Sequence, residues 1–268
     1  MANGAMFSND IFIEVGHGPT LIDNNIMLSK VNVIMPSEGI ACVHNLMLGS
    51  FTYLNSGVDS IVNGQREPRY TPYHIRHRTE VAGFMTILHG DDRVYNNIIV
   101  QKYPVTDPGR TALNNDYEVA GTASFDIFPS YEEWIANFKM DEEPDMDALA
   151  PYHFGHLPVW IEGNAYFGGA DVSRHEKNGF VCEDRDVYVE FTPEDGKPVL
   201  KTNIYDLLGD FRTGVITSDT LGCAFEPEQR FENPDGSAIV FDTDYFGAHR
   251  GLSALPGPFA EGSEKLYV

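Results

Sequence analysis

Four stretches of the chain share one pattern, in which a central asparagine has apolar residues on both sides. They are TLIDNNIML around Asn25, ACVHNLML around Asn45, RVYNNIIV around Asn97 and VWIEGNAYF around Asn164. The first two asparagines are 20 residues apart, and the next two spacings are 52 and 67 residues. A period of about 20 residues is typical of repeat architectures, and the longer spacings fit one repeat plus an inserted loop.

The repeat predicts short stacked strands joined by tight turns. Asparagine tolerates the left-handed turn conformation, and its side chain can bond to an equivalent asparagine in the next repeat. A leucine-rich repeat fits less well, because its helical segments and regularly spaced leucines are missing from these stretches. We therefore expect an all-β protein, a parallel β-helix in the form of a partial solenoid. The alternative is that asparagine-rich turns recur by chance between unrelated strands.

The same pattern divides the chain into two regions. We expect residues 1–178 to form the repeats, interrupted by long inserted loops at about 49–80 and 103–158, and residues 179–268 to form a β-rich C-terminal extension that packs on the solenoid. In the second insertion, Ser130 and Glu133 have the spacing of a helix capping box. In the extension, TPEDGK between two apolar runs predicts a hairpin turn.

The run IFIEV, which begins at Ile11, alternates in the way expected of a strand. Ile11, Ile13 and Val15 would face the interior, while Phe12 and Glu14 would face outward. A carboxyl group on a rigid strand, partly shielded from water by the inserted loops, can act as a proton donor. Glu14 is therefore a candidate catalytic acid, and its alternative role is that of an ordinary solvated glutamate.

Composition narrows the classes of partner. The chain has 18 basic and 40 acidic residues, a formal net charge of −22, which repels nucleic acids and anionic membranes but not a neutral sugar. The three cysteines have no paired spacing, and the histidines of YHIRHRTE lack a third ligand, so we expect no disulfide framework, metal or cofactor. The first residues do not read as a signal peptide, and we expect a cytoplasmic protein.

Several longer motifs together resemble a known enzyme family. DIFIEVGHGPTLIDNNIMLS, GIACVHNLMLGSF, RYTPYHIRHRTEVAGFMTILHGDDRVYNNI and YHFGHLPVWIEGNAYF are similar to the C-terminal part of the β-xylosidases of glycoside hydrolase family 120, from about Asp10 to Arg250. The resemblance implies a right-handed parallel β-helix. It also implies retaining hydrolysis of β-xylosides or xylo-oligosaccharides by an aspartate nucleophile and a glutamate acid/base, and the family's glutamate matches Glu14.

The sequence departs from this family at the second carboxylate. The family's nucleophilic aspartate lies about one repeat before its glutamate, on a strand with no counterpart in this sequence. We therefore expect a C-terminal portion that is catalytically incomplete by itself. An upstream polypeptide or a homo-oligomer would then complete the solenoid, because an open end exposes unpaired strands.

The remaining candidates are polar or aromatic residues that lie beside Glu14 or in the first insertion. These substrate-binding candidates are His17, Tyr73, His77, Arg78 and Glu80. The expected ligand is a xylo-oligosaccharide or another neutral glycoside. Two other functions remain open, a noncatalytic carbohydrate-binding protein and a structural fibre element. The long insertions disfavour the fibre, because a structural solenoid has short and uniform repeats.

Overall fold

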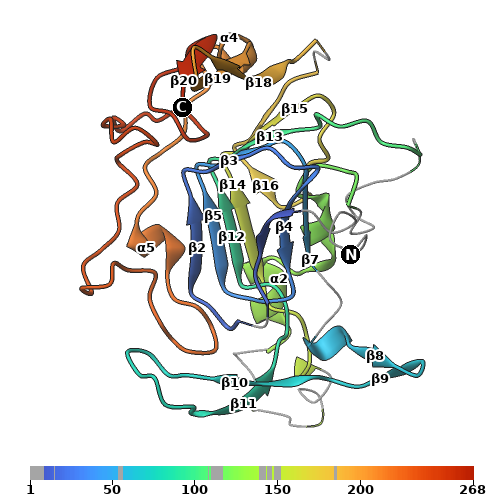
Figure 1. The fold of residues 1–268 in the computed structure, drawn as a ribbon. Helices are drawn as coiled ribbons and strands as arrows, with labels where there is room; N and C mark the ends of the chain where they lie inside the picture. Colours follow the sequence, from blue (N-terminus) through green and yellow to red (C-terminus); the bar gives the residue numbers. More distant parts are fainter. Residues whose placement is uncertain are drawn as a thin grey trace.

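A computed structural model describes residues 9–14, 16–53, 57–107, 109, 117–138, 143, 147, 152–183 and 186–268. Three parallel sheets lie at its centre, with hairpins below them in Figure 1 and the C-terminal part of the chain, orange to red, along one side. The first sheet has the order β1-β4-β7 and consists of β1 (Asn9–Phe12), β4 (Val31–Met35) and β7 (Ser50–Tyr53).

The two larger parallel sheets have five strands each. The second sheet has the order β16-β14-β12-β5-β2, and its strands are β2 (Thr20–Asp23), β5 (Ile40–Val43), β12 (Asp92–Tyr95), β14 (Val159–Glu162) and β16 (Glu176–Lys177). The third sheet has the order β17-β15-β13-β6-β3, and its strands are β3 (Ile26–Met27), β6 (Leu46–Met47), β13 (Ile98–Val100), β15 (Ala165–Phe167) and β17 (Phe180–Val181). Each copy of the asparagine pattern supplies one strand to each of these two sheets.

Equivalent residues of successive repeats lie beside one another, because the strands pair in parallel and in register. Ile22 is paired with Cys42, Cys42 with Val94, and Val94 in turn with Ile161. All four side chains are buried in the main apolar core. The apolar residue that precedes each asparagine by three positions therefore belongs to one continuous buried column, which is why the apolar pattern recurs.

The four repeat asparagines form a ladder of side-chain hydrogen bonds. The Nδ2 atom of Asn25 donates to Oδ1 of Asn45 at 3.0 Å. The Nδ2 atom of Asn45 donates to Oδ1 of Asn97 at 3.0 Å, and that of Asn97 donates to Oδ1 of Asn164 at 2.9 Å. Each accepting Oδ1 also receives the backbone N–H of the preceding asparagine. The predicted bonding between stacked asparagines is confirmed.

A left-handed residue precedes each asparagine of the ladder. Asn24, His44 and Asn96 have φ values of 53°, 56° and 55°, and Gly163 has a φ of 72°. Residues with a short polar side chain and glycine adopt this conformation at low cost. The turn redirects the chain from the second sheet to the third within two residues.

The ladder ends at Glu176. This residue is paired with Ile161, so it occupies the next position of the buried column, but its side chain is a carboxylate. It accepts the backbone N–H of Asn164 at 3.1 Å, the Nδ2 of Asn164 at 2.9 Å and the hydroxyl of Tyr166 at 2.5 Å. The next ladder position is Gly179, where an added Cβ would lie 2.6 Å from Cγ of Glu176. All three partners donate to this carboxyl group, and the next position has no side chain, so the ladder stops here.

Two insertions project from the parallel sheets. The first contains a short helix and two antiparallel hairpins, namely η1 (Gly57–Asp59), β8 (Ile61–Val62), β9 (Gln65–Arg66), β10 (Tyr70–Tyr73) and β11 (Gly83–Thr86). The second contains η3 (Ala123–Ile127) and α2 (Tyr131–Ala136). The predicted capping box of α2 is confirmed, since Oγ of Ser130 accepts the N–H of Glu133 at 3.1 Å and Oε2 of Glu133 accepts the N–H of Ser130 at 2.7 Å.

An antiparallel sheet and a long irregular segment follow the last parallel strands. The elements are β18 (Val189–Glu194), β19 (Lys197–Thr202), α4 (Ile204–Leu208), α5 (Ser218–Leu221) and β20 (Lys265–Tyr267), with β19 between β18 and β20. The predicted hairpin turn is confirmed at Asp195 and Gly196, which connect β18 to β19 with φ values of 51° and 77°. Residues 203–268 are called the C-terminal segment below.

Two buried arginines attach the C-terminal segment to the parallel sheets. Arg93 on β12 donates from Nε to the carbonyl of Leu221 and from Nη2 to that of Cys223, both at 2.8 Å. In the opposite direction, Nη2 of Arg250 donates to Oδ1 of Asn24 at 2.7 Å. A buried guanidinium is stable only when its N–H groups are bonded, so each arginine requires the segment to stay docked.

This architecture corrects the expected fold class. We predicted an all-β, right-handed parallel β-helix with a β-rich C-terminal extension. The described residues instead form separate parallel sheets of three, five and five strands, together with antiparallel sheets and the short helices α2, α4 and α5. Most of the C-terminal segment is turns and single bridges, with β20 as its one named strand among the described residues. The inward orientation expected for Val15 lies outside the described residues.

The ladder predicts unequal effects of two similar substitutions. Asn97→Ala removes an acceptor for two donors of Asn45 and a donor to Cys42, all within the core, and should lower the free energy of unfolding by about 3–4 kcal/mol. Asn25→Ala, at the partly buried end, should cost only about 1 kcal/mol. Urea denaturation measures both values, and equal losses would contradict a ladder whose inner members depend on buried bonds.

Candidate functional site

The strand that carries Glu14 has the predicted alternation. Ile11 and Ile13 pack against the main core, and the N–H of Ile13 donates to the carbonyl of Ile34 on β4 at 3.0 Å. Phe12 points outward and is 50% exposed, and Glu14 is also exposed. The assignment of the two faces of this strand is therefore confirmed for Ile11 to Glu14.

Glu14 lies at the surface beside a basic residue. Its Oε1 atom is 3.9 Å from Nη1 of Arg69, and the two side chains are 55% and 53% exposed. Water and salt screen a pair with this exposure, so its energetic contribution is small. Because the backbone of Arg69 is bonded to Gly57, the pair joins the end of β1 to the start of the β10–β11 hairpin. The shielding by loops that the sequence analysis expected for Glu14 is absent from the described structure.

His17 is buried and bonded at both ring nitrogens. Nδ1 lies 2.6 Å from Oε1 of Glu38, and Nε2 lies 2.9 Å from Oγ1 of Thr71. The Thr71 hydroxyl donates to the carbonyl of Met85, so it must accept from Nε2–H of His17. One proton then lies between His17 and Glu38, and the buried pair is neutral overall whichever atom holds it.

The His17–Glu38 pair anchors the first insertion to the parallel sheets. The other carboxylate oxygen of Glu38 accepts the N–H of Leu88 at 2.7 Å, just after β11. Thr71 belongs to β10, so both ends of the hairpin are bonded to this pair. A sugar could contact the imidazole of His17 only by displacing these bonds. His17 therefore lies beneath the surface between Glu14 and the β10–β11 hairpin and supports it.

The structure separates the other predicted binding residues into two places. The ring of Tyr73 makes an edge contact with that of His17, with the centroids 6.2 Å apart. His77, Arg78 and Glu80 are exposed in the connection between β10 and β11. Tyr73 at the end of β10 thus packs beside His17, while the other three lie in the exposed connection that follows it.

The connection between β10 and β11 contacts the C-terminal segment. Nε2 of His77 lies 3.2 Å from Oε1 of Glu232, and the backbone N–H of His77 donates to Oε1 of Gln229 at 2.9 Å. The N–H of Arg76 also donates to the carbonyl of Pro227. The hairpin is thus held at its base by His17 and near its tip by the C-terminal segment.

Asp91 and Asp92 are buried beneath this surface, although the sequence gives them the appearance of turn residues. Oδ2 of Asp91 accepts the N–H of Phe225 at 2.8 Å, and Oδ1 lies 2.6 Å from Nη1 of Arg93. Oδ1 of Asp92 accepts the N–H of Ile40 at 3.1 Å. Burial raises the pKa of Asp91 to about 6 and that of Asp92 well above its usual value, although Arg93 opposes both shifts. These carboxyl groups have structural partners and do not reach the surface.

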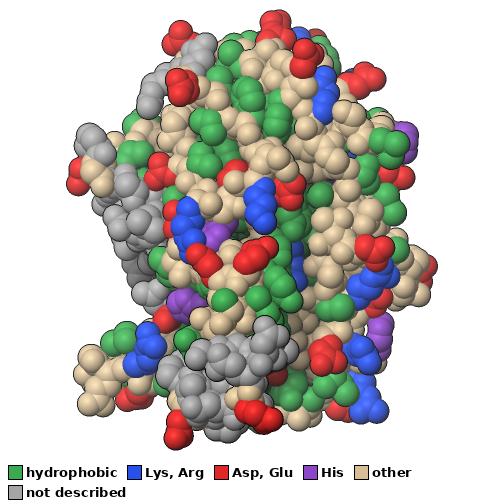
Figure 2. Space-filling model, turned by 180° about the vertical axis from the view of Figure 1, so that it is seen from behind, with side chains coloured by type: hydrophobic (Ala, Val, Ile, Leu, Met, Phe, Trp, Pro, Cys, Tyr) green, Lys and Arg blue, Asp and Glu red, His purple; other side chains and the backbone are tan. Residues whose placement is uncertain are grey.

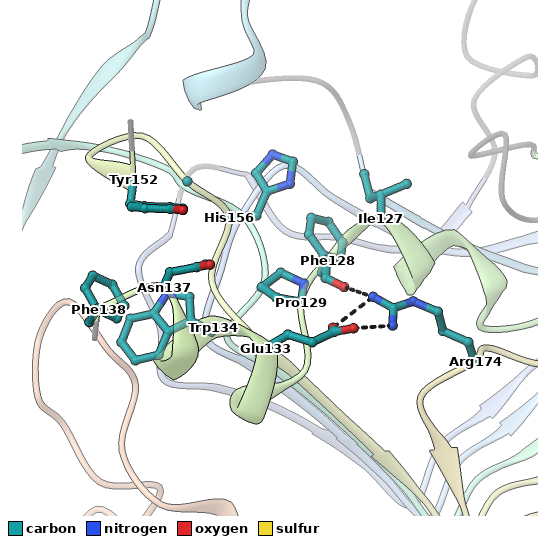
Figure 3. Close-up of a pocket in the computed structure, with 11 residues that line it drawn as sticks. Ile127, Phe128, Pro129, Glu133, Trp134, Asn137, Phe138, Tyr152, His156 and Arg174 are labelled. Carbon is teal, nitrogen blue, oxygen red and sulfur yellow. Dashed lines mark hydrogen bonds and ion pairs between the residues drawn. The ribbon is translucent and has the colours of Figure 1, made fainter. Parts of the chain in front are cut away.

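A pocket beside α2 has aromatic walls. Its volume is about 380 Å³, and Trp134, Phe138 and Tyr152 contribute its aromatic side, with the side chain of Asn137 between them (Figure 3). On the opposite side, Glu133 and Arg174 form a two-bond ion pair with distances of 2.8 and 3.0 Å. This pocket was not predicted from the sequence, because its walls come from the middle and the end of the second insertion and from Arg174, which follows β15.

A second hollow of about 280 Å³ lies on the other flank of α2. Its aromatic wall is a stacked pair, Tyr131 and Trp160, with ring centroids 6.2 Å apart. Arg174 lines both hollows. Trp160 also lies under the guanidinium of Arg93 at 4.6 Å, so part of this wall is fixed by the attachment of the C-terminal segment.

Charged side chains of both signs are mixed on the face drawn in Figure 2. Figure 2 shows acidic side chains scattered over one face, with basic and apolar groups among them. Within the described residues, no group of three or more His, Cys, Asp or Glu side chains could hold a metal ion, and no helix could cross a membrane. These surfaces are therefore suited to neutral ligands more than to polyanions.

Comparison with known proteins adds one similarity. No protein-family model and no curated protein matches the chain. Among solved structures, the chain is similar to one described as "The complex structure of XylC with xylose", with 30% sequence identity and a TM-score of 0.77. The two chains share a fold. The match covers 97% of this chain but 37% of the XylC chain, so this chain spans little more than a third of that protein.

The buried anchor of the hairpin gives a prediction about His17. His17→Ala leaves the Glu38 carboxyl buried without its partner and should lower the free energy of unfolding by about 3–5 kcal/mol. It should also speed amide hydrogen exchange along β10 and β11. The exposed His77 serves as the control, since His77→Ala should change the free energy by less than about 0.5 kcal/mol. A similar small loss for both variants would show that the buried pair is not an anchor.

The raised pKa of Asp91 predicts a particular pH dependence. The folded state binds this proton more tightly than the unfolded chain, whose Asp pKa is 3.8. The resulting stabilisation is complete below that value and is lost as the pH rises through about 6. Urea denaturation across this window should show a clearly smaller fall in Asp91→Asn than in the native protein, because only Asp92, whose pKa is also raised, still contributes there. The exposed Asp210→Asn should behave like the native protein, and a native slope in Asp91→Asn would refute the assignment.

Proposed function

We propose that the chain is part of a xylan-related glycosidase that acts on β-xylosides or xylo-oligosaccharides. The observation that carries this proposal is the 30% identity and shared fold with XylC, whose structure was solved with xylose. The outward position of Glu14, two residues after the end of β1, supports it, because the resemblance to the β-xylosidase family implies an acid/base glutamate at this residue. In a retaining mechanism Glu14 would protonate the leaving oxygen and then accept a proton from water.

The backbone around Glu14 suits this task. The N–H of Ile13, just after β1, donates to Ile34 on β4, and Ile11 and Ile13 pack on the core, so the backbone that carries the carboxyl group is held in place. We place the substrate between Glu14 and the β10–β11 hairpin, where Arg69 and Tyr73 can contact its hydroxyl groups. His77, Arg78 and Glu80 would then contact the substrate further out along the same hairpin. His17 would support this surface from below.

A retaining mechanism needs a second carboxylate about 5–5.5 Å from the first. Among the described residues, the buried acidic side chains near this end of the sheets are Glu38, Asp91 and Asp92, and each accepts a backbone N–H. None of these three is free to attack a sugar. We therefore propose that the nucleophilic aspartate belongs to polypeptide outside this sequence, and an upstream segment or a second chain would supply it.

An alternative function is noncatalytic carbohydrate binding. The exposure of Glu14 favours this alternative, because a general acid is usually shielded from water and this carboxyl is 55% exposed. The aromatic pocket beside α2 is consistent with it as well. The two functions differ in whether Glu14 has a chemical role.

A chimera tests that role. Residues 10–268 would replace the matching part of XylC, and the chimera would be assayed with aryl β-xylosides that have a good or a poor leaving group. With the poor leaving group, Glu14→Gln should reduce turnover by about 10²–10⁴-fold, because that step needs a proton. With the good leaving group the first step should change little.

The exposed Glu190 on β18 provides the matched control, and Glu190→Gln should leave both rates unchanged. Equal effects of Glu14→Gln on the two substrates would argue against an acid/base role. Turnover by the isolated chain that depends on Glu14 would contradict an external nucleophile. A chimera that binds xylotriose without turnover would favour the noncatalytic alternative.

A further inference from the structure

The pocket beside α2 has no part in the chemistry proposed for Glu14, which is not among its lining residues. We propose that this pocket, built by Trp134, Asn137 and Tyr152, is a separate binding site for a neutral oligosaccharide. It would hold a sugar chain without cleaving it. The inference goes beyond the proposed function, and only the choice of a xylose-based probe rests on that function.

The aromatic wall of the pocket is fixed before any ligand arrives. Trp134 packs against the small apolar cluster that contains Val58, Leu88 and Leu157, and its ring meets that of Phe138 edge-on with the centroids 4.8 Å apart. Tyr152 is 40% exposed across the pocket. The C–H face of a pyranose can lie on such rings, and rigid aromatic side chains lose little conformational entropy when they bind.

Polar groups converge on the same space. Asn137 ends α2, and its side-chain amide, which offers both a donor and an acceptor, points between Trp134 and Tyr152 (Figure 3). Such a group can bond to adjacent hydroxyls of a sugar that rests on the rings. A purely apolar ligand would leave this amide unmatched, and that favours a polyhydroxylated one.

The ion pair at the rim gives the pocket a rigid polar edge with no net charge. Arg174 forms a fork with Glu133 and also donates to the carbonyls of Asp126 and Phe128. The bond from Arg174 holds the pKa of Glu133 at about 2, so its carboxylate accepts hydrogen bonds at every working pH. Because Arg174 cancels this charge and the chain has a net charge of −22, the site suits a neutral ligand and not an anion.

The size of the pocket agrees with this ligand class. A volume of about 380 Å³ falls in the lower part of the range for small-molecule sites, about 300–1,000 Å³. A holding site on the same molecule raises the local concentration of a polymeric substrate.

The two tryptophans of the chain, Trp134 and Trp160, allow a direct test. Trp160→Phe leaves Trp134 as the single fluorophore, and Trp134→Phe leaves Trp160. Xylotriose should cause a saturable change in emission in the first variant and none in the second. In the Trp160→Phe background, Asn137→Ala or Tyr152→Ala should weaken binding by at least about tenfold.

Two controls separate this site from other effects. Glu132 lies on the same helix but lines the second hollow, so Glu132→Gln should leave the affinity for xylotriose unchanged. Glu14→Gln should also leave it unchanged, so an inactive chimera with normal binding would overturn the proposed function alone. The pocket assignment would be overturned if Trp160→Phe, which retains Trp134, showed no saturable change, or if Trp134→Phe responded equally. Full binding by a variant that combines Asn137→Ala with Tyr152→Ala would also overturn it.

Discussion

The asparagine ladder is the constraint on which the parallel sheets depend. Each bond of 2.9–3.0 Å between neighbouring asparagines is accompanied by a backbone donor to the same oxygen, so the register of two strands is fixed at every turn. A slip of one residue would break both bonds and turn the buried column of Ile22 to Ile161 out of the main core, toward the face of the sheet that packs on the C-terminal segment. The ladder also has a direction, because every member donates toward Glu176, where the donors end.

Local signals predicted local structure well. The asparagines that bond in series, the faces of Ile11 to Glu14, the capping box at Ser130 and the turn at Asp195 are set by neighbours or by the repeat itself. The fold class was wrong, because the pattern marks strands without showing how sheets are separated or what the C-terminal segment becomes. The buried aromatic residues of the C-terminal segment, such as Phe231 and Phe241, are isolated among turn residues. Their spacing matches the period of neither a strand nor a helix.

Burial at the candidate site could not be predicted, because it depends on partners far away in the sequence. We expected Glu14 to be partly shielded from water, but its side chain is 55% exposed, whereas Asp91, in a stretch that resembles a turn, is buried. Asp91 is covered by Phe225, 134 residues later, and Asp92 bonds to Ile40, 52 residues earlier. His17 likewise meets Thr71, 54 residues away. Nothing in the local pattern around these residues records those contacts.

The positions of the two insertions between members of the ladder determine where the protein can tolerate change. Between Asn45 and Asn97, and again before Asn164, the chain leaves the sheets and returns to the same register. Since loop closure costs grow only slowly with length, these excursions can be lengthened, shortened or exchanged while the framework keeps its geometry. New recognition loops could therefore be introduced at these two insertion points, by evolution or by design, while the stacked turns keep the framework unchanged.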